Sequence, residues 1–181
     1  MAVFFCPTIS FYFNFKTKMQ DYFVPSQTRI GHVHLKVANL ERSLDFYCGL
    51  LGFELTTTYG SQAAFISAGG YHHHIGLNTW QSLNGPRPDQ RATGLFHTAI
   101  LYPTRRDLAV IYQRVSGSGY PFSGFADHGV SEALYLDDPD GNGVELYWDK
   151  PREFWPTGPN GAIEMYTKPL DLDNLLLELD A

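Results

Sequence analysis

The stretch that decides the fold is Ala133-Leu-Tyr-Leu-Asp-Asp-Pro-Asp-Gly-Asn-Gly-Val-Glu-Leu-Tyr-Trp148. Residues 138–143, at its centre, are dense in residues that preset a turn or tolerate a positive φ. The flanks carry the aromatic and branched side chains typical of strands. The stretch therefore predicts a tight β-hairpin, which is favoured over a calcium loop because the ligand spacing of an EF-hand is missing. Glu145 is out of place in a half-buried strand, since a buried carboxylate is costly unless it is paired or binds a metal.

Outward from the hairpin, the same order of elements occurs twice along the chain. Each half opens on a short alternating strand that carries histidine, continues as an amphipathic helix and closes with three strands. The first helix is capped by Asn39, and the second opens with a capping box formed by Thr104 and Asp107. This internal repeat predicts an α+β fold in which paired βαβββ modules form a curved mixed-sheet cup with the helices outside.

Composition divides the chain into an extension, a domain and a tail. The segments are an extension at 1–28, a domain at 29–150 with modules 29–80 and 95–150 around a linker at 81–94, and a tail at 151–181. We expect the extension to be poorly ordered, with Met19 rather than Met1 as the start or residues 1–18 as a leader. A signal peptide is disfavoured because no basic leader is present and Pro7 interrupts the apolar run. The tail ends in an expected short amphipathic helix at 171–179.

Composition also excludes several kinds of partner. The 181 residues carry 13 basic and 19 acidic side chains, a net charge of −6, and no basic run that would neutralise nucleic acid phosphates. No apolar run reaches the roughly 18 residues that span a membrane. The two cysteines, Cys6 and Cys48, form no CxxC motif or disulfide framework, which is typical of the reducing cytoplasm.

Three side chains share the inner face of the expected cup. Along a strand successive side chains alternate between faces, and the apolar partners of His32, His97 and Glu145 face the helices. Two neutral imidazoles and one carboxylate are the facial triad of non-haem Fe(II) enzymes, and the same set suits Zn²⁺, Mn²⁺ or Ni²⁺. His34 has the same parity as His32, and we interpret it as cavity lining.

Two motifs carry a resemblance to a known family over about residues 29–156. They are Gly31-His-Val-His-Leu-Lys-Val-Ala-Asn-Leu-Glu-Arg-Ser-Leu-Asp-Phe-Tyr47, followed by Leu51-Gly-Phe53, and Asp138-Pro-Asp-Gly-Asn-Gly-Val-Glu145. With them the chain resembles the vicinal oxygen chelate superfamily, which includes glyoxalase I, fosfomycin-resistance proteins and type I extradiol dioxygenases. The resemblance implies the same three metal ligands that strand parity selects.

Within this superfamily the chain is most similar to catechol 2,3-dioxygenase-like proteins. That similarity implies three catalytic groups beside the metal: His73, His128 and Tyr135. It also implies an Fe(II)-dependent extradiol ring-cleaving dioxygenase that uses O₂ on a catechol-like aromatic substrate, with Mn(II), Zn(II) or Ni(II) as alternative ions. Tyr135 and a histidine would handle the catechol proton, and a second histidine would act in general acid–base catalysis.

One departure and two alternatives accompany this expectation. Catechol 2,3-dioxygenases contain two repeat pairs, whereas this chain has one, which implies a complete cup within a homodimer. One alternative is another metalloenzyme of this fold, namely a glyoxalase-type lyase or isomerase or a small-molecule-modifying transferase. The other is a non-catalytic protein that binds an aromatic ligand. Glyoxalase I has a glutamate ligand in its first repeat, where this chain offers His73 or His74.

Overall fold

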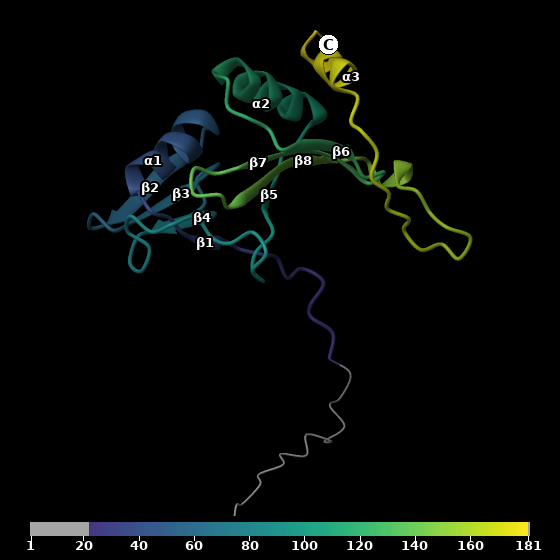
Figure 1. The fold of residues 1–181 in the computed structure, drawn as a ribbon. Coiled ribbons are helices and arrows are strands. Elements are labelled where there is room, and N and C mark those ends of the chain that lie inside the picture. Colours follow the sequence, from purple (N-terminus) through teal and green to yellow (C-terminus); the bar gives the residue numbers. More distant parts are fainter. Residues whose placement is uncertain (1–21, 181) are drawn as a thin grey trace, which may run out of the picture. The chain divides into compact units, whose positions relative to one another are not determined.

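The computed structural model describes residues 22–180 of the chain (Figure 1). The expectations for residues 1–18 and for Met19 lie outside these described residues. One compact unit ends at Ile30 and a second begins at Gly31. All described helices and strands belong to the second unit. None of the described helices is long and apolar enough to cross a membrane.

The first module consists of four strands and one helical segment. Its elements are β1 (Val33–Lys36), α1 (Leu40–Leu44), a π-helical continuation (Asp45–Leu50), β2 (Glu54–Tyr59), β3 (Ala63–Ser67) and β4 (Ile75–Asn78). The sheet order is β1-β4-β3-β2, and β1 runs parallel to β4 while the other neighbours are antiparallel. The mixed sheet follows directly from the helical crossover between β1 and β2, which leaves β1 to pair with β4.

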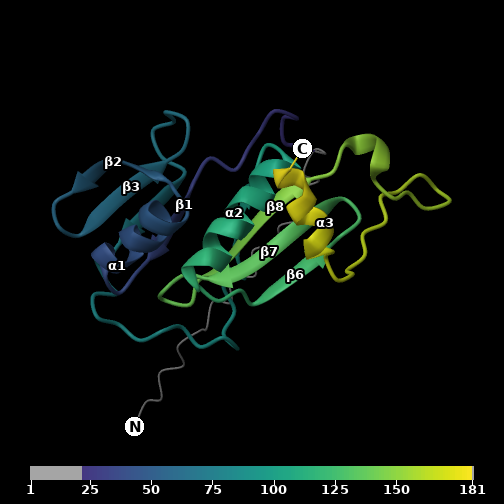
Figure 2. The same ribbon diagram turned by 90° about the horizontal axis from the view of Figure 1, so that it is seen from above.

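The second module repeats this arrangement. Its elements are β5 (Thr98–Leu101), α2 (Arg105–Ser118), β6 (Gly124–Asp127), β7 (Ser131–Asp137) and β8 (Gly143–Asp149). The order β5-β8-β7-β6 matches that of the first sheet, again with one parallel pair, β5 and β8. In each module the helix covers one face of its sheet and leaves the other face without a helix (Figures 1 and 2). The predicted α+β class with two βαβββ modules is confirmed.

The two long helical segments differ in regularity. The predicted capping box is present at Thr104 and Asp107, and α2 ends at Gly119 in the left-handed conformation (φ 76°). The predicted first helix also begins as expected, since the Asn39 side chain accepts a hydrogen bond from the Arg42 backbone. It changes to π-helical hydrogen bonding from Asp45 onward, a feature that hydrophobic spacing does not reveal.

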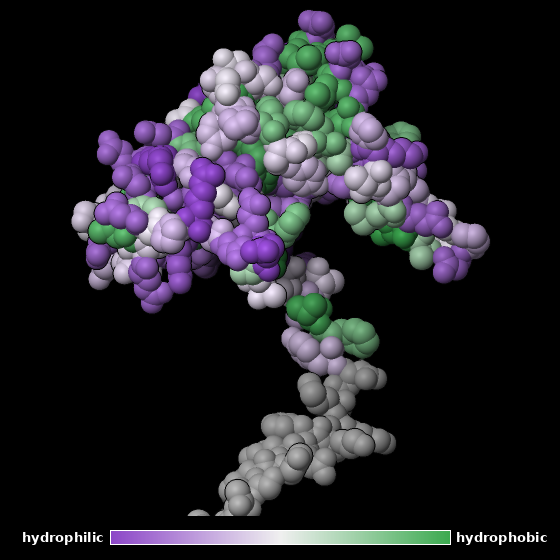
Figure 3. Space-filling model, viewed as in Figure 1, coloured by the Kyte–Doolittle hydropathy of each residue, from purple (hydrophilic) through white to green (hydrophobic). Residues whose placement is uncertain are grey.

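The tail runs back over the second module. It contains a short 3₁₀ helix (Arg152–Phe154) and α3 (Leu172–Leu176), which continues as a 3₁₀ turn (Leu177–Leu179). Helix α3 packs beside α2 (Figure 2) and buries Leu175 completely. In the view of Figure 3, hydrophobic surface gathers over the second module near α2 and α3, whereas hydrophilic side chains dominate the first module.

Candidate active site

Strand pairing in the second module brings two predicted ligands together. Glu145 lies in β8, and His97 directly precedes β5, the parallel neighbour of β8. A Cβ at Gly143 would overlap the carbonyl oxygen of Phe96, so only glycine lets the two strands approach this closely at that point. As a result His97 Nε2 lies 3.0 Å from Glu145 Oε2.

A hydrogen-bonded chain extends from this pair to two of the predicted catalytic residues. Tyr135 stands directly opposite Glu145 in the antiparallel β7–β8 ladder, and its hydroxyl donates to Glu145 Oε1 at 2.9 Å. His128 Nε2 lies 2.7 Å from the same hydroxyl oxygen. The structure thus connects four of the six predicted site residues, His97, Glu145, Tyr135 and His128, along one face of the second sheet.

The surroundings of Glu145 control the acidity of Tyr135. Burial raises the pKa of Tyr135, and the hydrogen bond to the Glu145 carboxylate and its negative charge raise that pKa further. Burial followed by repulsion from Glu145 also raises the pKa of Asp149, which shares this face of β8. After burial, the Glu145 carboxylate contributes to both shifts, so a cation bound beside it would act in the opposite direction.

The first module gathers its histidines differently. The ring of His32 lies against that of His73, with 4.4 Å between ring centroids, and His73 Nδ1 is 2.7 Å from His72 Nδ1. Burial and the nearby rings of His32 and His72, in that order, lower the pKa of His73. The predicted catalytic His73 is therefore held toward the neutral state, in which an imidazole accepts a proton or binds a metal.

His34 lines the same part of the first module, as its parity predicts. Its ring packs 5.4 Å from that of Trp80 and against the bare backbone of Gly76, where a Cβ would lie 2.9 Å from the imidazole. Burial, followed by the neighbouring His32, lowers the pKa of His34. Tilted ring contacts with neighbouring side chains therefore position the imidazoles of His32 and His34.

The three predicted metal ligands are not gathered in one cluster. Among residues 22–180, no group of three or more histidine, cysteine, aspartate or glutamate side chains is arranged to hold a metal ion. The structure joins His97 to Glu145, while His32 lies with His73 instead. The complete triad of His32, His97 and Glu145 stays a prediction.

The donor atoms of the His97–Glu145 pair nevertheless suit a metal ion. His97 Nε2 and Glu145 Oε2 lie 3.0 Å apart, so a nitrogen and an oxygen donor of the kind that Fe(II), Mn²⁺ or Zn²⁺ accepts already lie side by side. The other ring nitrogen, His97 Nδ1, is buried without a hydrogen-bond partner among the described groups. Nε2 is therefore the ring atom that would bind an ion shared with Glu145.

The hairpin turn has a structural function that the sequence patterns did not predict. Asp138 is buried, and its Oδ1 accepts hydrogen bonds from the backbone of Asp140 and Asn142, each 2.9 Å long. Its Oδ2 accepts a 3.1 Å hydrogen bond from Tyr47 in the π-helical segment of the first module. Burial and then the negative charge of Asp138 raise the pKa of Tyr47.

Asp140 adds a second link from the same turn to the first module. Its carboxylate accepts a 3.0 Å hydrogen bond from the backbone of Ala38 and forms an ion pair with Arg42. The turn between the strands that carry Tyr135 and Glu145 is therefore fastened to the start of α1. The sequence signal for this link, the aspartates of the turn, indicated only a turn conformation.

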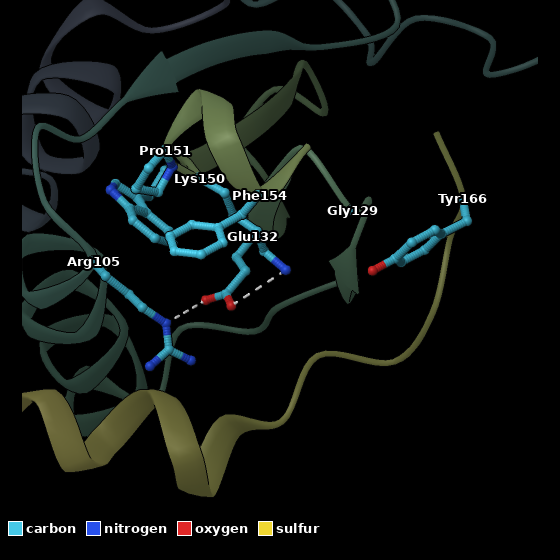
Figure 4. Close-up of a pocket in the computed structure, with 8 residues that line it drawn as sticks. Arg105, Gly129, Glu132, Lys150, Pro151, Phe154 and Tyr166 are labelled. Atoms are coloured by element: carbon cyan, nitrogen blue, oxygen red, sulfur yellow. Dashed lines mark hydrogen bonds and ion pairs between the residues drawn. The ribbon is translucent and has the colours of Figure 1, made fainter. Parts of the chain in front are cut away.

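A pocket of about 380 Å³ lies on the opposite face of the second sheet (Figure 4). Glu132 and Trp148 line this pocket and pair with each other across β7 and β8, three positions along each strand from the Tyr135–Glu145 pair. Because side chains alternate between faces along a strand, an odd offset points these two to the helix-covered face. At its base Glu132 Oε2 accepts a 2.7 Å hydrogen bond from Arg105 Nε, and Lys150 Nζ lies 3.9 Å from Glu132 Oε1. The pocket is distinct from the predicted catalytic face.

Comparison with known proteins agrees with this fold. Residues 29–146 match the model of the glyoxalase/bleomycin resistance protein/dioxygenase superfamily. The crystal structure of a glyoxalase/dioxygenase from Nostoc punctiforme superimposes with a TM-score of 0.60 at 17% identity, covering 74% of this chain and 99% of that one. The chain therefore belongs to the glyoxalase/bleomycin resistance protein/dioxygenase superfamily.

Two relatives carry the names of dioxygenases of aromatic diols. A catechol-2,3-dioxygenase of Bacillus subtilis (strain 168) is 40% identical over 155 residues, which cover 86% of this chain and 53% of that protein. A biphenyl-2,3-diol 1,2-dioxygenase of Rhodococcus globerulus is 33% identical over 121 residues, covering 67% of this chain and 63% of that protein. The chain thus spans about half the length of the Bacillus relative.

Proposed function

We propose that this protein is a metal-dependent extradiol dioxygenase that opens the ring of a catechol-like substrate with O₂. The observation that carries the proposal is the hydrogen-bonded chain from His97 through Glu145 and Tyr135 to His128. It supports the proposal because a histidine–carboxylate pair lies beside a tyrosine and a histidine that can carry protons. The names of the two dioxygenase relatives support the same reaction class.

His97 and Glu145 would hold the metal, with His32 as the third ligand contributed by the first module. We propose Fe(II), with Mn(II), Zn(II) and Ni(II) as the alternatives that the same donors accept. Bound iron would bring the two catechol oxygens and O₂ together at one centre. The proposed partners are a small aromatic diol and O₂. We do not propose nucleic acid or a membrane as a partner.

The protein residues would handle the protons of the substrate. Tyr135 donates to Glu145 and its hydroxyl oxygen lies 2.7 Å from His128 Nε2, so Tyr135 would orient a substrate hydroxyl and His128 would offer a proton beside it. His73, whose neutral form is favoured by burial and by neighbouring imidazoles, would take up and return a proton from the first module. General acid–base groups of this kind contribute about 100- to 10,000-fold to a rate.

We further propose a homodimer in the reducing cytoplasm. The single pair of modules motivates the dimer, in which two copies would supply the two pairs that occur in the longer relatives. Cys48, the described cysteine, is a free thiol, as that compartment favours. Sedimentation of the purified full chain would show a mass of twice the protomer, and a protomer mass would refute the dimer.

The decisive experiment is anaerobic reconstitution with Fe(II), followed by addition of a catechol and then of air. A yellow ring-opened product is expected, together with consumption of O₂. If several catechols give no product although iron is bound, ring cleavage is wrong. Turnover of a thiol adduct of a 2-oxoaldehyde would then indicate a glyoxalase-type enzyme. Tight binding of a catechol without any turnover would indicate a binding protein.

A further inference from the structure

The tail beyond the superfamily match contacts one of the proposed catalytic residues. The family model ends at residue 146, whereas Tyr166, Thr167 and Lys168 lie against the loop that carries His128. Lys168 exchanges two backbone hydrogen bonds with Asp127, of 2.8 and 2.9 Å, in an antiparallel bridge at the end of β6. Tyr166 N donates to the His128 carbonyl oxygen at 3.3 Å. The backbone of the tail therefore fixes the backbone on both sides of His128.

Packing at Gly129 shows how closely the tail is docked. Gly129 has a φ of 80°, and a Cβ there would lie 2.7 Å from the ring of Tyr166 and 2.9 Å from Pro156. Figure 4 shows the Tyr166 ring, which projects from the tail, beside Gly129. Only glycine satisfies both the backbone conformation and the available space. The loop and the tail are therefore matched in shape.

The tail presents hydrogen-bonding groups to Nδ1 of the His128 imidazole, and the number of available protons decides which of them bonds to it. The single hydroxyl proton of Tyr135 is donated to Glu145, so the 2.7 Å contact between Tyr135 and His128 requires a proton on His128 Nε2. In the neutral ring Nδ1 then carries a lone pair and needs a donor. The Thr167 hydroxyl, 3.2 Å away, can supply one.

The second tail group at Nδ1, the Tyr166 carbonyl, is a hydrogen-bond acceptor and not a donor. The Tyr166 carbonyl oxygen also lies 3.2 Å from Nδ1, and a carbonyl can only accept a hydrogen bond. It therefore becomes a partner when His128 takes up a second proton on Nδ1. The Thr167 hydroxyl can thus donate to the neutral ring, and the Tyr166 carbonyl can accept from the protonated ring, without movement of the ring.

From these contacts we propose that Tyr166 and Thr167 are positioning residues that keep His128 in its Nε2–H tautomer and accommodate its change of protonation state during the reaction. The proposal rests on the proposed ring-cleavage function. When the His128 ring takes up a second proton, Nδ1 gains it from solvent on the exposed Thr167 side, so Thr167 stops donating and the Tyr166 carbonyl accepts, while Nε2–H still points to Tyr135. When His128 returns the proton, the exchange reverses. Tyr135 keeps its hydrogen bond to Glu145 in both states.

Charged groups around the loop do not compete for this role. Asp127 is engaged by Lys150 Nζ at 2.8 Å and by the backbone of Gly129 at 2.8 Å. Although burial opposes the change, those two hydrogen bonds hold the pKa of Asp127 below its usual range. The ammonium group of Lys168 lies over the Tyr166 ring, 4.3 Å from its centroid. The groups that face Nδ1 are therefore the hydroxyl and the carbonyl.

The test compares Thr167→Val, which removes the hydroxyl at nearly constant shape, with Thr167→Ser, which retains it. Thr167 is exposed, so neither change removes core packing. Nitrogen NMR of the metal-free full chain reports which ring nitrogen is protonated, and a His128→Gln variant assigns the signals. We expect Nε2–H in the wild type and in Thr167→Ser. In Thr167→Val the ring should shift to Nδ1–H, donating to the Tyr166 carbonyl, and the Tyr135 hydroxyl should turn from Glu145 to donate to Nε2.

Kinetics of the iron-loaded protein give the second readout. We expect kcat for ring cleavage to fall about tenfold in Thr167→Val with KM nearly unchanged, as part of the general acid–base contribution, and to recover in Thr167→Ser. An unchanged tautomer in Thr167→Val, or Nδ1–H already in the wild type, would overturn the proposal. If the wild type cleaves no catechol, the ring-cleavage function fails, and the NMR comparison still decides whether the tail positions His128.

Discussion

The two modules share one topology but hold their polar groups by different means. In the second, Glu145, Tyr135, His97 and His128 are linked by contacts of 2.7 to 3.0 Å between hydrogen-bonding atoms. In the first, His32 packs ring against ring with His73. Hydrogen bonds specify both distance and direction, whereas a tilted ring contact restricts direction less. The difference concerns His32, which ring contacts position, because His73 Nδ1 is itself 2.7 Å from His72 Nδ1; the second module therefore holds its ligand pair more tightly than the first holds His32.

The largest effect is expected from removing the centre of the second module's network. Glu145→Ala should lower Fe(II) affinity by more than about 100-fold, because loss of residues that merely support a ligand costs about 10- to 100-fold. Iron content after anaerobic loading and desalting measures this loss. The matched control Glu54→Ala, on the exposed strand β2, should bind iron as the wild type does. Equal iron content in both variants would show that Glu145 is not a ligand.

The next effect concerns the link between the ligand and the proton-carrying histidine. Tyr135→Phe removes the hydroxyl that bridges Glu145 and His128, so kcat should fall by about 100-fold or more while iron is still bound. Steady-state O₂ consumption with catechol measures the change. Tyr112→Phe, a matched substitution on α2, should leave the rate unaltered. A Tyr135→Phe enzyme with wild-type kcat would remove Tyr135 from the mechanism.

A third substitution tests the connection between the two modules. Asp138→Ala deprives the Tyr47 hydroxyl and two turn amides of their acceptor, so the free energy of unfolding should fall by about 2 to 3 kcal/mol. Urea denaturation measures it, with Asp137→Ala at the neighbouring exposed position as the control. A change below about 0.5 kcal/mol would mean that the turn does not fasten the modules together.

The smallest expected effect is a pH dependence that originates in the first module. The pKa values of His34 and His73 are lowered in the folded state, chiefly by burial. The unfolded chain therefore binds more protons, and this contribution to stability is present above the unfolded pKa of about 6.5 and is lost as the pH falls below it. Urea midpoints between pH 5 and 8 should decline on the acid side, and less steeply in His73→Gln. An identical decline in that variant would contradict the assignment.

Local sequence patterns predicted the fold well because they are set by neighbouring residues. The alternation around His32, the capping box at Thr104 and the turn after Asp138 each depend on a few adjacent side chains. Strand parity likewise predicted a shared face for His97 and Glu145, and the structure pairs them. Membership of the superfamily accounts for the order of elements.

The remaining features depend on contacts between residues far apart in the chain. The hydrogen bonds from Tyr47 and from Ala38 to the turn connect residues 91 and 102 positions apart, and no local pattern encodes them. The same holds for Thr167 beside His128. The distance from His32 to His97 and Glu145 also lies beyond local patterns, because parity specifies the face of a strand and not the distance across to the other sheet.

The parallel pairing of β5 with β8 has a consequence for how the protein folds. Helix α2, β6 and β7 all lie between these two strands in the chain, so His97 and Glu145 meet only after that long segment has been ordered. Pairings between distant segments form late, because their loop entropy is lost before contacts compensate for it. We therefore expect the α2 helix and the β7–β8 hairpin to form first. The ability to capture metal would then appear only at the final, slowest step of folding.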